Sequence, residues 1–302
     1  MNSRIQLLVV IALAQIVIVG LLLLTSGSTQ EETGPWITLT QPDVTRIDVG
    51  DKANTASIAK GDSGWEIAGL PADEEKITSI LQKLTELEAP WPVATSADAL
   101  ARFEVSEENH QRRVTVYAGE ESVLELFLGT SPGYQRVHAR KADDGGIYSV
   151  ALSNYELPTD VGGWMDKALF AEREAPTEIV ANLADGSKTY LSKGDEGWHM
   201  GGEVVDQDVA TTYANRFKTF RVLGIYDGDK ELELQGIIEL GDPVTQSLEI
   251  FREVEEGDYA LRVEGFSDAF EVSAYNAEQI LMTDVEFSIE EASALEAEPT
   301  VE

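Results

Sequence analysis

The sequence predicts an α+β fold made of two tandem, duplicated modules. One observation is a repeated phrase: residues 59–67 read AKGDSGWEI and residues 192–200 read SKGDEGWHM. A second is that the residues around both phrases correspond at one offset of 133 residues. A third is that a strand-like alternation and an amphipathic helical stripe recur in the same order beside each phrase. An internal duplication explains all three.

Ten residues carry the repeat motif: Lys60, Gly61, Asp62, Gly64 and Trp65 in copy one, and Lys193, Gly194, Asp195, Gly197 and Trp198 in copy two. Glycine tolerates positive φ and aspartate accepts hydrogen bonds from its own backbone, so this is turn chemistry. We expect strands over 44–49 and 55–60, a four-residue hairpin loop over 61–64, and a returning strand over 65–67. The offset of 133 pairs Ile47 with Val180.

The two motif tryptophans have two interpretations. We favour a structural one, in which Trp65 and Trp198 pin each hairpin against the following helix, because both lie in predicted strands. The alternative is a sugar-stacking platform. The motif lysines and aspartates are interpreted as solubilising turn residues.

One amphipathic helix is expected after each hairpin. Asp73 suits its N-cap in copy one. The apolar stripe comprises Ile77, Ile80, Leu81, Leu84 and Leu87, and its copy-two counterparts are Ala210, Tyr213, Ala214, Phe217 and Phe220. A helical spacing that survives with different side chains predicts a retained fold with a repacked core.

An antiparallel meander is expected after each helix. The predicted strands are 113–117, 123–128, 135–140 and 146–150 in copy one, and 247–251, 259–263 and 269–272 in copy two. Near the ends Val150 corresponds to Val272, so the offset falls to 122 and copy two has lost eleven residues from its loops. A short helix is expected over 162–170. Hairpin-dominated strands argue against a doubly wound parallel sheet.

The N-terminus predicts a membrane anchor. Residues 5–24 form an uncharged, apolar run whose helical length of about 30 Å matches a bilayer core. Basic Arg4 before it and acidic Glu31 after it place residues 1–4 in the cytoplasm and the body outside the inner membrane. A cleaved signal peptide is the alternative. The predicted order continues with a linker over 25–35, module one over 36–170, module two over 171–289 and a disordered acidic tail over 290–302.

Charge and composition exclude several classes of function. The chain has 22 basic and 55 acidic residues and a net charge of −33. Nucleic-acid binding requires clustered basic residues, so it is not expected. The absence of cysteine excludes disulfides and thiolate metal sites.

No motif predicts catalysis. His110, His138 and His199 have no second ligand at helical spacing. Residues 227–231 lack the glycine and glutamate spacing of a calcium loop. Residues 57–60 match S-x-x-K, but they fall in a predicted strand without partner motifs. We therefore expect no catalytic residue, no cofactor and no metal, and a protein that is not an enzyme.

Three stretches resemble the domain-of-unknown-function 4340 family. They are the hairpin and helix over 64–87, LGTSPGYQRVHARKADDGGIYSV at 128–150 and WMDKALF at 164–170. The resemblance covers residues 37–285. It implies one N-terminal anchor, an exported α+β body, and partners among ABC-type transporter components, including gliding-motility-like systems. It implies no catalytic residues.

The expected function is that of a non-catalytic accessory subunit of an ABC-type transport system, with a permease or an auxiliary subunit as its protein partner. The alternative is an envelope carbohydrate- or peptidoglycan-binding module. That alternative is based on the aromatic residues Trp65, Trp91, Trp164 and Trp198.

Overall fold

The computed structural model describes residues 36–89, 91–168, 174–241, 245–255 and 257–281, together with residues 15 and 287. Apart from residue 15, the predicted cytoplasmic segment 1–4, anchor 5–24, linker 25–35 and tail 290–302 lie outside the described residues. No helix among the described residues is long and apolar enough to cross a membrane.

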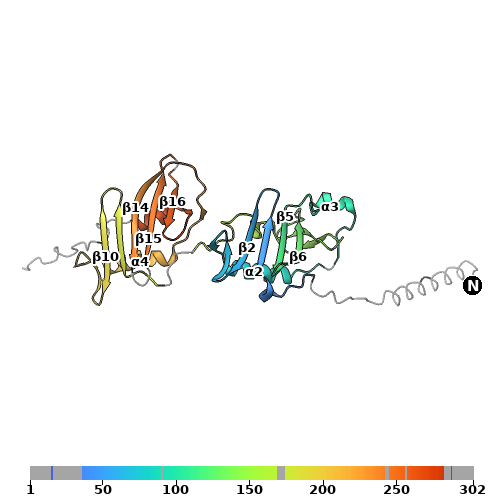
Figure 1. Ribbon diagram of the computed structural model, residues 1–302, viewed down its shortest axis with the longest axis horizontal. Helices are drawn as coiled ribbons and strands as arrows, with labels where there is room; N and C mark the ends of the chain where they lie inside the picture. Colours follow the sequence, from blue (N-terminus) through green and yellow to red (C-terminus); the bar gives the residue numbers. More distant parts are fainter. Residues whose placement is uncertain are drawn as a thin grey trace, which may run out of the picture.

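Two antiparallel sheets organise the described chain, which confirms the α+β class (Figure 1). Sheet one has the strand order β4-β3-β2-β1-β5-β6-β7-β8, and sheet two has the order β12-β11-β10-β9-β14-β15-β16-β17-β13. The first eight strands of sheet two therefore repeat the topology of sheet one. The two sheets follow one another along the long axis of the molecule (Figure 1).

The elements have the following bounds. Sheet one contains β1 Arg46–Gly50, β2 Thr55–Gly61, β3 Gly64–Ile67, β4 Leu70–Pro71, β5 Arg112–Ala118, β6 Glu121–Leu128, β7 Val137–Lys141 and β8 Tyr148–Val150. Sheet two contains β9 Glu178–Leu183, β10 Lys188–Gly194, β11 Gly197–Met200, β12 Glu203–Val204, β13 Gly224–Ile225, β14 Leu232–Gly241, β15 Gln246–Glu253, β16 Tyr259–Val263 and β17 Ala269–Val272. The helices are α2 Glu74–Thr85, α3 Ala97–Phe103, α4 Gln207–Thr219 and α5 Ala274–Ile280, with short 3-10 turns η1 Gln41–Asp43 and η2 Asn154–Glu156.

Each hairpin and its meander form one sheet because the first strand of the module is central. β1 pairs with β2 on one side and with β5 on the other. In the same way β9 pairs with β10 and β14. The sequence prediction missed β14, and it also missed the additional helices α3 and α5.

The repeat motif forms a tighter hairpin than predicted. Gly61 pairs with Gly64, and Gly194 pairs with Gly197, so each loop has two residues rather than four. Gly64 has φ +133° and Gly197 has φ +107°, which L side chains rarely adopt. The glycines are therefore the last paired residues of the strands.

The predicted correspondence of Ile47 with Val180 is wrong. In β1 Ile47 and Val49 face the core, whereas in β9 the buried residues are Ile179 and Ala181. The offset is therefore 132 in the first strand and becomes 133 in the second, where Ile58 and Leu191 are both buried. Copy two carries one extra residue in the loop between these strands, and a one-residue slip reverses the faces of a strand.

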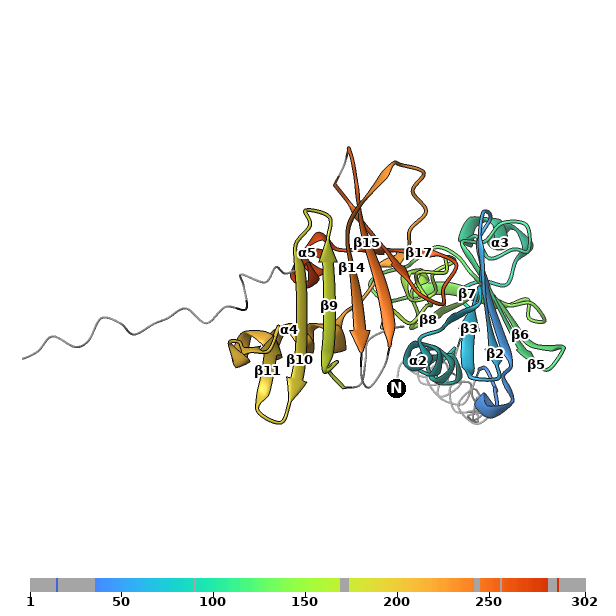
Figure 2. The ribbon, with the colours of Figure 1, turned by 60° about the vertical axis from the view of Figure 1, so that its left-hand side comes forward.

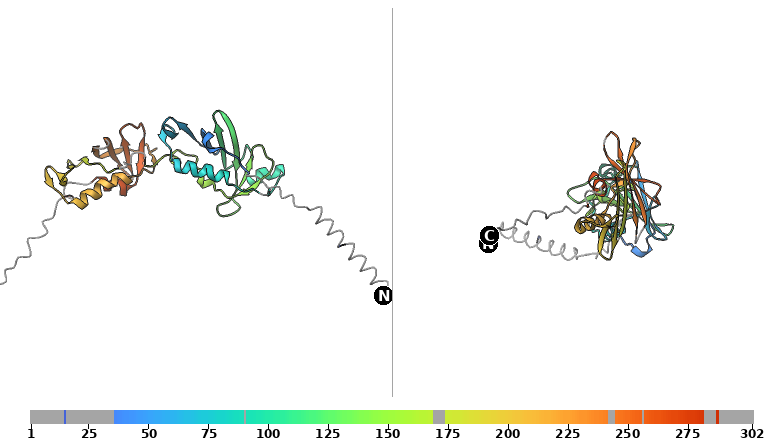
Figure 3. Two further views of the ribbon diagram at one scale, coloured as in Figure 1. Left: turned by 90° about the horizontal axis from the view of Figure 1, so that it is seen from below. Right: turned by 90° about the vertical axis from the view of Figure 1, so that its left-hand side faces the viewer.

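The amphipathic helices cover one face of each sheet, as Figure 3 shows for α2 and α4. Ile77, Ile80, Leu81 and Leu84 are the buried residues of α2, and Leu87 is buried just beyond its end. The predicted copy-two stripe is buried in full. Both stripes are confirmed, and the Asp73 side chain caps α2 by accepting from the Lys76 N–H at 2.9 Å.

The first residue of each helix bonds back to the hairpin. Glu74 Oε1 accepts from the backbone N–H of Trp65 at 3.3 Å, and Gln207 Oε1 accepts from that of Trp198 at 2.7 Å. Gln207 also donates to the Trp198 carbonyl at 2.9 Å. This hairpin–helix lock holds both turns against the start of the helix that follows.

The segment after each meander closes the module at the helix N-cap. The Asp73 N–H donates to the carbonyl of Trp164 at 2.8 Å, and the Asp206 N–H donates to that of Phe287 at 3.2 Å. Trp164 and Phe287 are both fully buried. The predicted helix over 162–170 is wrong for its described part, which forms turns because Trp164–Asp166 bonds sideways to α2 and β4.

The eleven lost residues lie mainly at one place. Val93 and Tyr226 make equivalent backbone hydrogen bonds, because the N–H of Val93 donates to the Ile147 carbonyl and the N–H of Tyr226 donates to the Ala269 carbonyl. The two residues are 133 positions apart, so the offset of 133 persists up to Tyr226. Val114 pairs with Val49, and Ile238 pairs with Ala181, which gives an offset of 124. Module one therefore carries nine extra residues in the stretch that contains α3.

We predict that Gly197→Ala lowers the free energy of unfolding by about 1–3 kcal/mol, because alanine is strained at this φ and its Cβ meets the Gln207 side chain. The control is Gly194→Ala, which meets no atom within 4 Å and is expected to change stability by less than about 0.5 kcal/mol. Urea unfolding of the full-length chain measures both. Equal effects would contradict a special role for the glycine after the turn.

Candidate functional site

A shallow hollow of about 490 Å³, bordered mainly by polar residues, opens at one end of sheet one. It is formed by the β1–β2 loop, by the segment between α3 and β5, and by the first residue of β5. Its lining residues are Asp51, Lys52, Ala53, Glu104, Asn109, His110, Gln111 and Arg112. We call it the module-one hollow.

Asp51 organises the floor of the hollow. Its Oδ1 accepts from the backbone N–H groups of Ala53 at 2.8 Å and Asn54 at 2.9 Å, which shapes the β1–β2 turn. Its Oδ2 accepts from the Thr159 hydroxyl at 3.0 Å and lies 3.5 Å from Nη1 of Arg112. The bonds from Asn54 and Ala53, helped by Thr159 and Arg112, lower the pKa of Asp51 below its usual value.

The Arg112 guanidinium is held in place by backbone carbonyls. Its Nε donates to the Leu157 carbonyl at 3.0 Å and its Nη1 to the Gln111 carbonyl at 2.7 Å. The side chain is 23% exposed, so its charge remains available to a ligand in the hollow. A pair of charges exposed to this degree contributes little to stability. The guanidinium therefore ties the segment after η2 to the start of β5 and also leaves a partly exposed charge at the hollow.

The wall of the hollow comes from the segment after α3. The Gln111 amide donates to Glu104 at 2.6 Å and accepts from Asn154 at 2.7 Å. Lys52 Nζ donates to Asn109 Oδ1 at 2.9 Å across the mouth. Two further donors of the lysine ammonium group remain for a bound molecule.

A close backbone contact supports this wall from below. Glu104 ends α3 in the left-handed conformation with φ 56°. Gly129 packs directly under it, and a Cβ at Gly129 would overlap the carbonyl oxygens of Phe103 and Glu104. Glycine is required at Gly129 because any side chain would push the α3 segment away.

Module two fills the equivalent position with apolar groups. Leu183 pairs with Gly236, and these residues correspond to Asp51 and Arg112 at offsets of 132 and 124. Leu281 corresponds to Thr159 at the offset of 122. A Cβ on Gly236 would lie 2.9 Å from Cδ2 of Leu183 and 2.9 Å from Cδ2 of Leu281, so the leucines close over the glycine. The shared fold thus does not need polar residues here.

The chemistry of Asp51 and Arg112 suits hydrogen bonding to a polar group rather than proton transfer. A carboxylate whose pKa is lowered is a poor general base, and a guanidinium does not exchange protons near neutral pH. The lining supplies two cations, two carboxylates and three other polar side chains. Among the described residues no group of three or more potential ligands could hold a metal ion.

The predicted motif residues lie elsewhere. The hairpin turns at the far end of β2 from Asp51, and none of the ten motif residues lines the hollow. Trp198 is 2% exposed, and its indole N–H donates to the Thr211 hydroxyl on α4 at 3.2 Å. Trp65 is half-buried, with the Lys60 ammonium 5.4 Å from its ring centre. Ser57 and Lys60 point to opposite faces of β2 because they are three residues apart on a strand.

The sequence reasoning missed Asp51, Arg112 and Thr159. A signal for them existed, because each is polar in copy one and apolar in copy two once the offsets of 132, 124 and 122 are applied. The offset of 133 pairs Arg112 with Thr245 and so concealed its apolar counterpart. Their correspondence became clear from the strand register.

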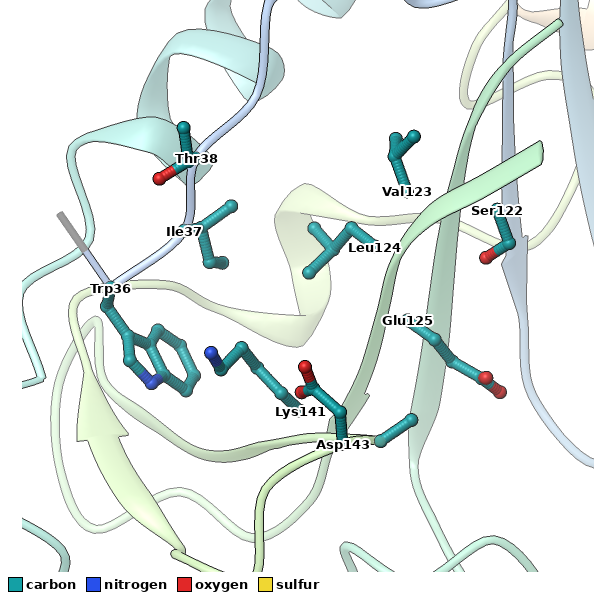
Figure 4. Close-up of a pocket in the computed structure, with 10 residues that line it drawn as sticks. Trp36, Ile37, Thr38, Ser122, Val123, Leu124, Glu125, Lys141 and Asp143 are labelled. Atoms are coloured by element: carbon teal, nitrogen blue, oxygen red, sulfur yellow. The ribbon is translucent and has the colours of Figure 1, made fainter.

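A second hollow of about 430 Å³ lies beside β6 (Figure 4). β7 pairs only with Leu126–Leu128, so the first half of β6 has an open edge facing Trp36 and Ile37. Figure 4 shows the Trp36 ring and the Lys141 side chain pointing toward one another. The Trp36 indole nitrogen is buried without a hydrogen-bond partner among the described residues.

We predict that the Asp51→Asn variant is less stable than the wild type at neutral pH and that this difference in the free energy of unfolding becomes smaller as the pH falls. Because the folded-state pKa is lowered, the carboxylate stabilises the fold above about pH 4 and this contribution is lost as the pH falls through the folded pKa. The wild type should therefore exceed the variant in stability at pH 7 and approach it below about pH 4 in urea unfolding of the full-length chain. Asp62→Asn at the exposed hairpin turn is the charge-matched control. A deficit that is constant with pH would contradict the prediction.

Comparison with known proteins identifies the family. No curated protein and no solved structure matches the chain significantly. The model of the family described as "Domain of unknown function (DUF4340)" matches residues 65–236, from β3 of module one to β14 of module two. The match includes α3 and Arg112 and covers more than half of the 302 residues. The chain belongs to the DUF4340 family.

Proposed function

We propose that the protein is a non-catalytic, membrane-anchored accessory subunit of an ABC-type transport system. In this proposal residues 5–24 anchor it in the inner membrane and its body lies on the extracytoplasmic side. The module-one hollow contacts a polar segment of a transporter permease or auxiliary subunit.

One observation carries the proposal. Asp51, Arg112 and Thr159 form a polar network at a position where the duplicated module packs Leu183, Gly236 and Leu281. Apolar packing at such a site is often as stable as a charge network, so the fold alone does not explain the polar residues. The nine extra residues of module one lie beside the same network and supply the wall of the hollow. Both differences between the copies therefore converge on one recognition surface.

A role without catalysis is favoured by the side chains of this surface. The hollow offers hydrogen-bond donors and acceptors with balanced charge, and it holds no nucleophile beside a base. Polar rims and fixed guanidinium groups are common at protein interfaces, where arginine is enriched.

Envelope carbohydrate binding is the second candidate, and tryptophan exposure weakens it. Trp198 and Trp164 are 2% and 0% exposed, so neither ring can stack on a sugar. Trp91 is 80% exposed and remains the best candidate for such a contact. Substitution of Trp198 would disturb the core rather than a glycan site.

The decisive experiment is a crosslinked pull-down of the tagged full-length chain from native membranes, followed by mass spectrometry. We expect the wild type to recover a transporter permease, ATPase or auxiliary subunit. Arg112→Met keeps the volume of the side chain but removes its charge, and it should reduce this recovery at least about tenfold. A second variant, Asp51→Leu/Arg112→Gly/Thr159→Leu, installs the three residues of module two and should reduce the recovery as strongly.

Arg113→Met is the matched control, because Arg113 follows Arg112 on β5 but faces the other side of the sheet, beside Glu125. It should leave recovery unchanged, and thermal unfolding should confirm that all variants fold. Recovery of the bait with glycan fragments and without a transporter subunit would overturn the proposal and favour the carbohydrate alternative. Equal loss in the Arg112 and Arg113 variants would show that the hollow is not the contact.

A further inference from the structure

The open face of sheet two, opposite α4 and α5, carries apolar side chains. These helices lie behind the strands in Figure 2. Val180 on β9 pairs with Tyr190 on β10, and Leu234 on β14 pairs with Phe251 on β15. Tyr190 is 46% exposed and Leu234 is 37% exposed. With Ile237 of β14, these five residues form a stripe across four strands, which we call the module-two stripe.

The equivalent face of sheet one is polar at the positions that correspond to Val180, Tyr190 and Ile237. Phe127, which pairs with Arg113 on the same face, is buried with Ala99 of α3, Val105 and Ile147. Asp48 and Ser57 correspond to Val180 and Tyr190, form the same cross-strand pair, and share a hydrogen bond of 2.6 Å. Arg113 corresponds to Ile237 and forms an ion pair with Glu125. The solvated face of an antiparallel sheet is usually polar, so sheet one follows the rule at these positions and sheet two departs from it.

An acidic hollow of about 460 Å³ adjoins the stripe on the same sheet. Its lining includes Glu239, Glu249 and Glu264, with Arg262 as its only basic residue. The Arg262 guanidinium lies 4.8 Å from the ring centre of Phe251 and links the hollow to the stripe. Glu239 pairs with Val180, so a carboxylate and the stripe meet directly.

We propose that the open face of sheet two binds a basic amphipathic segment of a protein partner. Leucine-like side chains of the segment would cover the module-two stripe, and its lysines or arginines would face Glu239, Glu249 and Glu264. Neighbouring apolar residues that are exposed or half-buried beside a charged rim indicate an interaction surface, and complementary charge selects the partner. The net charge of −33 opposes an anionic membrane surface as the occupant and opposes a second copy of the chain. This surface is separate from the module-one hollow and does not depend on the function proposed for it.

The first test replaces the β9–β10 end of the stripe by the residues that the same fold carries in module one. Val180→Asp/Tyr190→Ser installs the Asp48–Ser57 pair in sheet two. The probe is a synthetic helical peptide of about 18 residues, or five turns, with leucines on one face and lysines on the other. We expect the full-length wild type to bind it at least about tenfold more tightly than the swapped variant in calorimetry at 0.15 M salt.

Two controls separate recognition from bulk attraction to an acidic protein. The wild type should bind a scrambled peptide of the same composition only weakly. Its affinity for that peptide should not exceed the affinity of the swapped variant for the amphipathic peptide. The reverse exchange, Asp48→Val/Ser57→Tyr, alters sheet one and should leave peptide binding unchanged. Equal affinity for the amphipathic and scrambled peptides, or for the wild type and the swapped variant, would overturn the proposal.

The second test identifies the natural occupant. A photocrosslinking amino acid is placed at Tyr190 or, as the matched control, at Ser57, and crosslinked peptides from native membranes are sequenced by mass spectrometry. We expect a basic amphipathic segment at Tyr190 and none at Ser57. Crosslinks at Tyr190 to lipid, to a second copy or to an acidic segment would overturn the proposal. The two proposals can be tested separately. Loss of peptide binding in the swapped variant, with unchanged recovery of a transporter subunit in the pull-down, would support the stripe as a binding surface distinct from the module-one hollow.

Discussion

The hairpin–helix lock is the interaction on which the rest of each module depends. The glycine after the turn lets the chain pass under the first residue of the helix, whose side chain accepts the next backbone N–H. The lock fixes the start of the helix beside the hairpin, and the apolar stripe of the helix then packs on the sheet. With the helix in place, β1 or β9 can hold the hairpin on one side and the meander on the other. The repeated phrase is therefore conserved between the copies because the backbone needs it.

Comparison of the two copies separates what the fold requires from what it tolerates. Positions that are alike in both copies, such as Ile58 and Leu191, belong to the shared core. Positions that differ in polarity are free of that constraint. Arg112 and Gly236 form one such pair of positions, and Ser57 and Tyr190 form another. Arg112 belongs to the hollow of module one, whereas Tyr190 belongs to the stripe of module two. The duplication has thus produced one scaffold with two chemically different surfaces.

Much of the fold could be predicted from the sequence because the repeated features are local. The alternation of polar and apolar residues along a strand, the turn glycines and the helical stripe from Ile77 to Leu84 all depend on near neighbours. The elements that they predict have small errors at their ends. β14 was missed because its open face carries Ile237 where alternation predicts a polar residue, and because a bulge near Gln235 interrupts its period.

The candidate site could not be predicted in the same way. Asp51, Arg112 and Thr159 are brought together from the β1–β2 turn, the start of β5 and the segment after η2, with up to 108 residues between them. No local pattern records such a contact. Even the duplication conceals it, because one inserted residue in a loop moves the register by one and pairs the wrong side chains until the strands are seen.

The closing segment of module one also has a mechanical consequence. Trp164 holds the N-cap of α2, and three residues later the carbonyl of Lys167 accepts the Val222 N–H of module two at 3.0 Å. Gly162 and Gly224 approach at the same joint. The segment that closes module one is therefore also the segment that contacts module two. Any displacement of one module against the other acts on residues next to the N-cap of α2, so it is transmitted to the inside of module one.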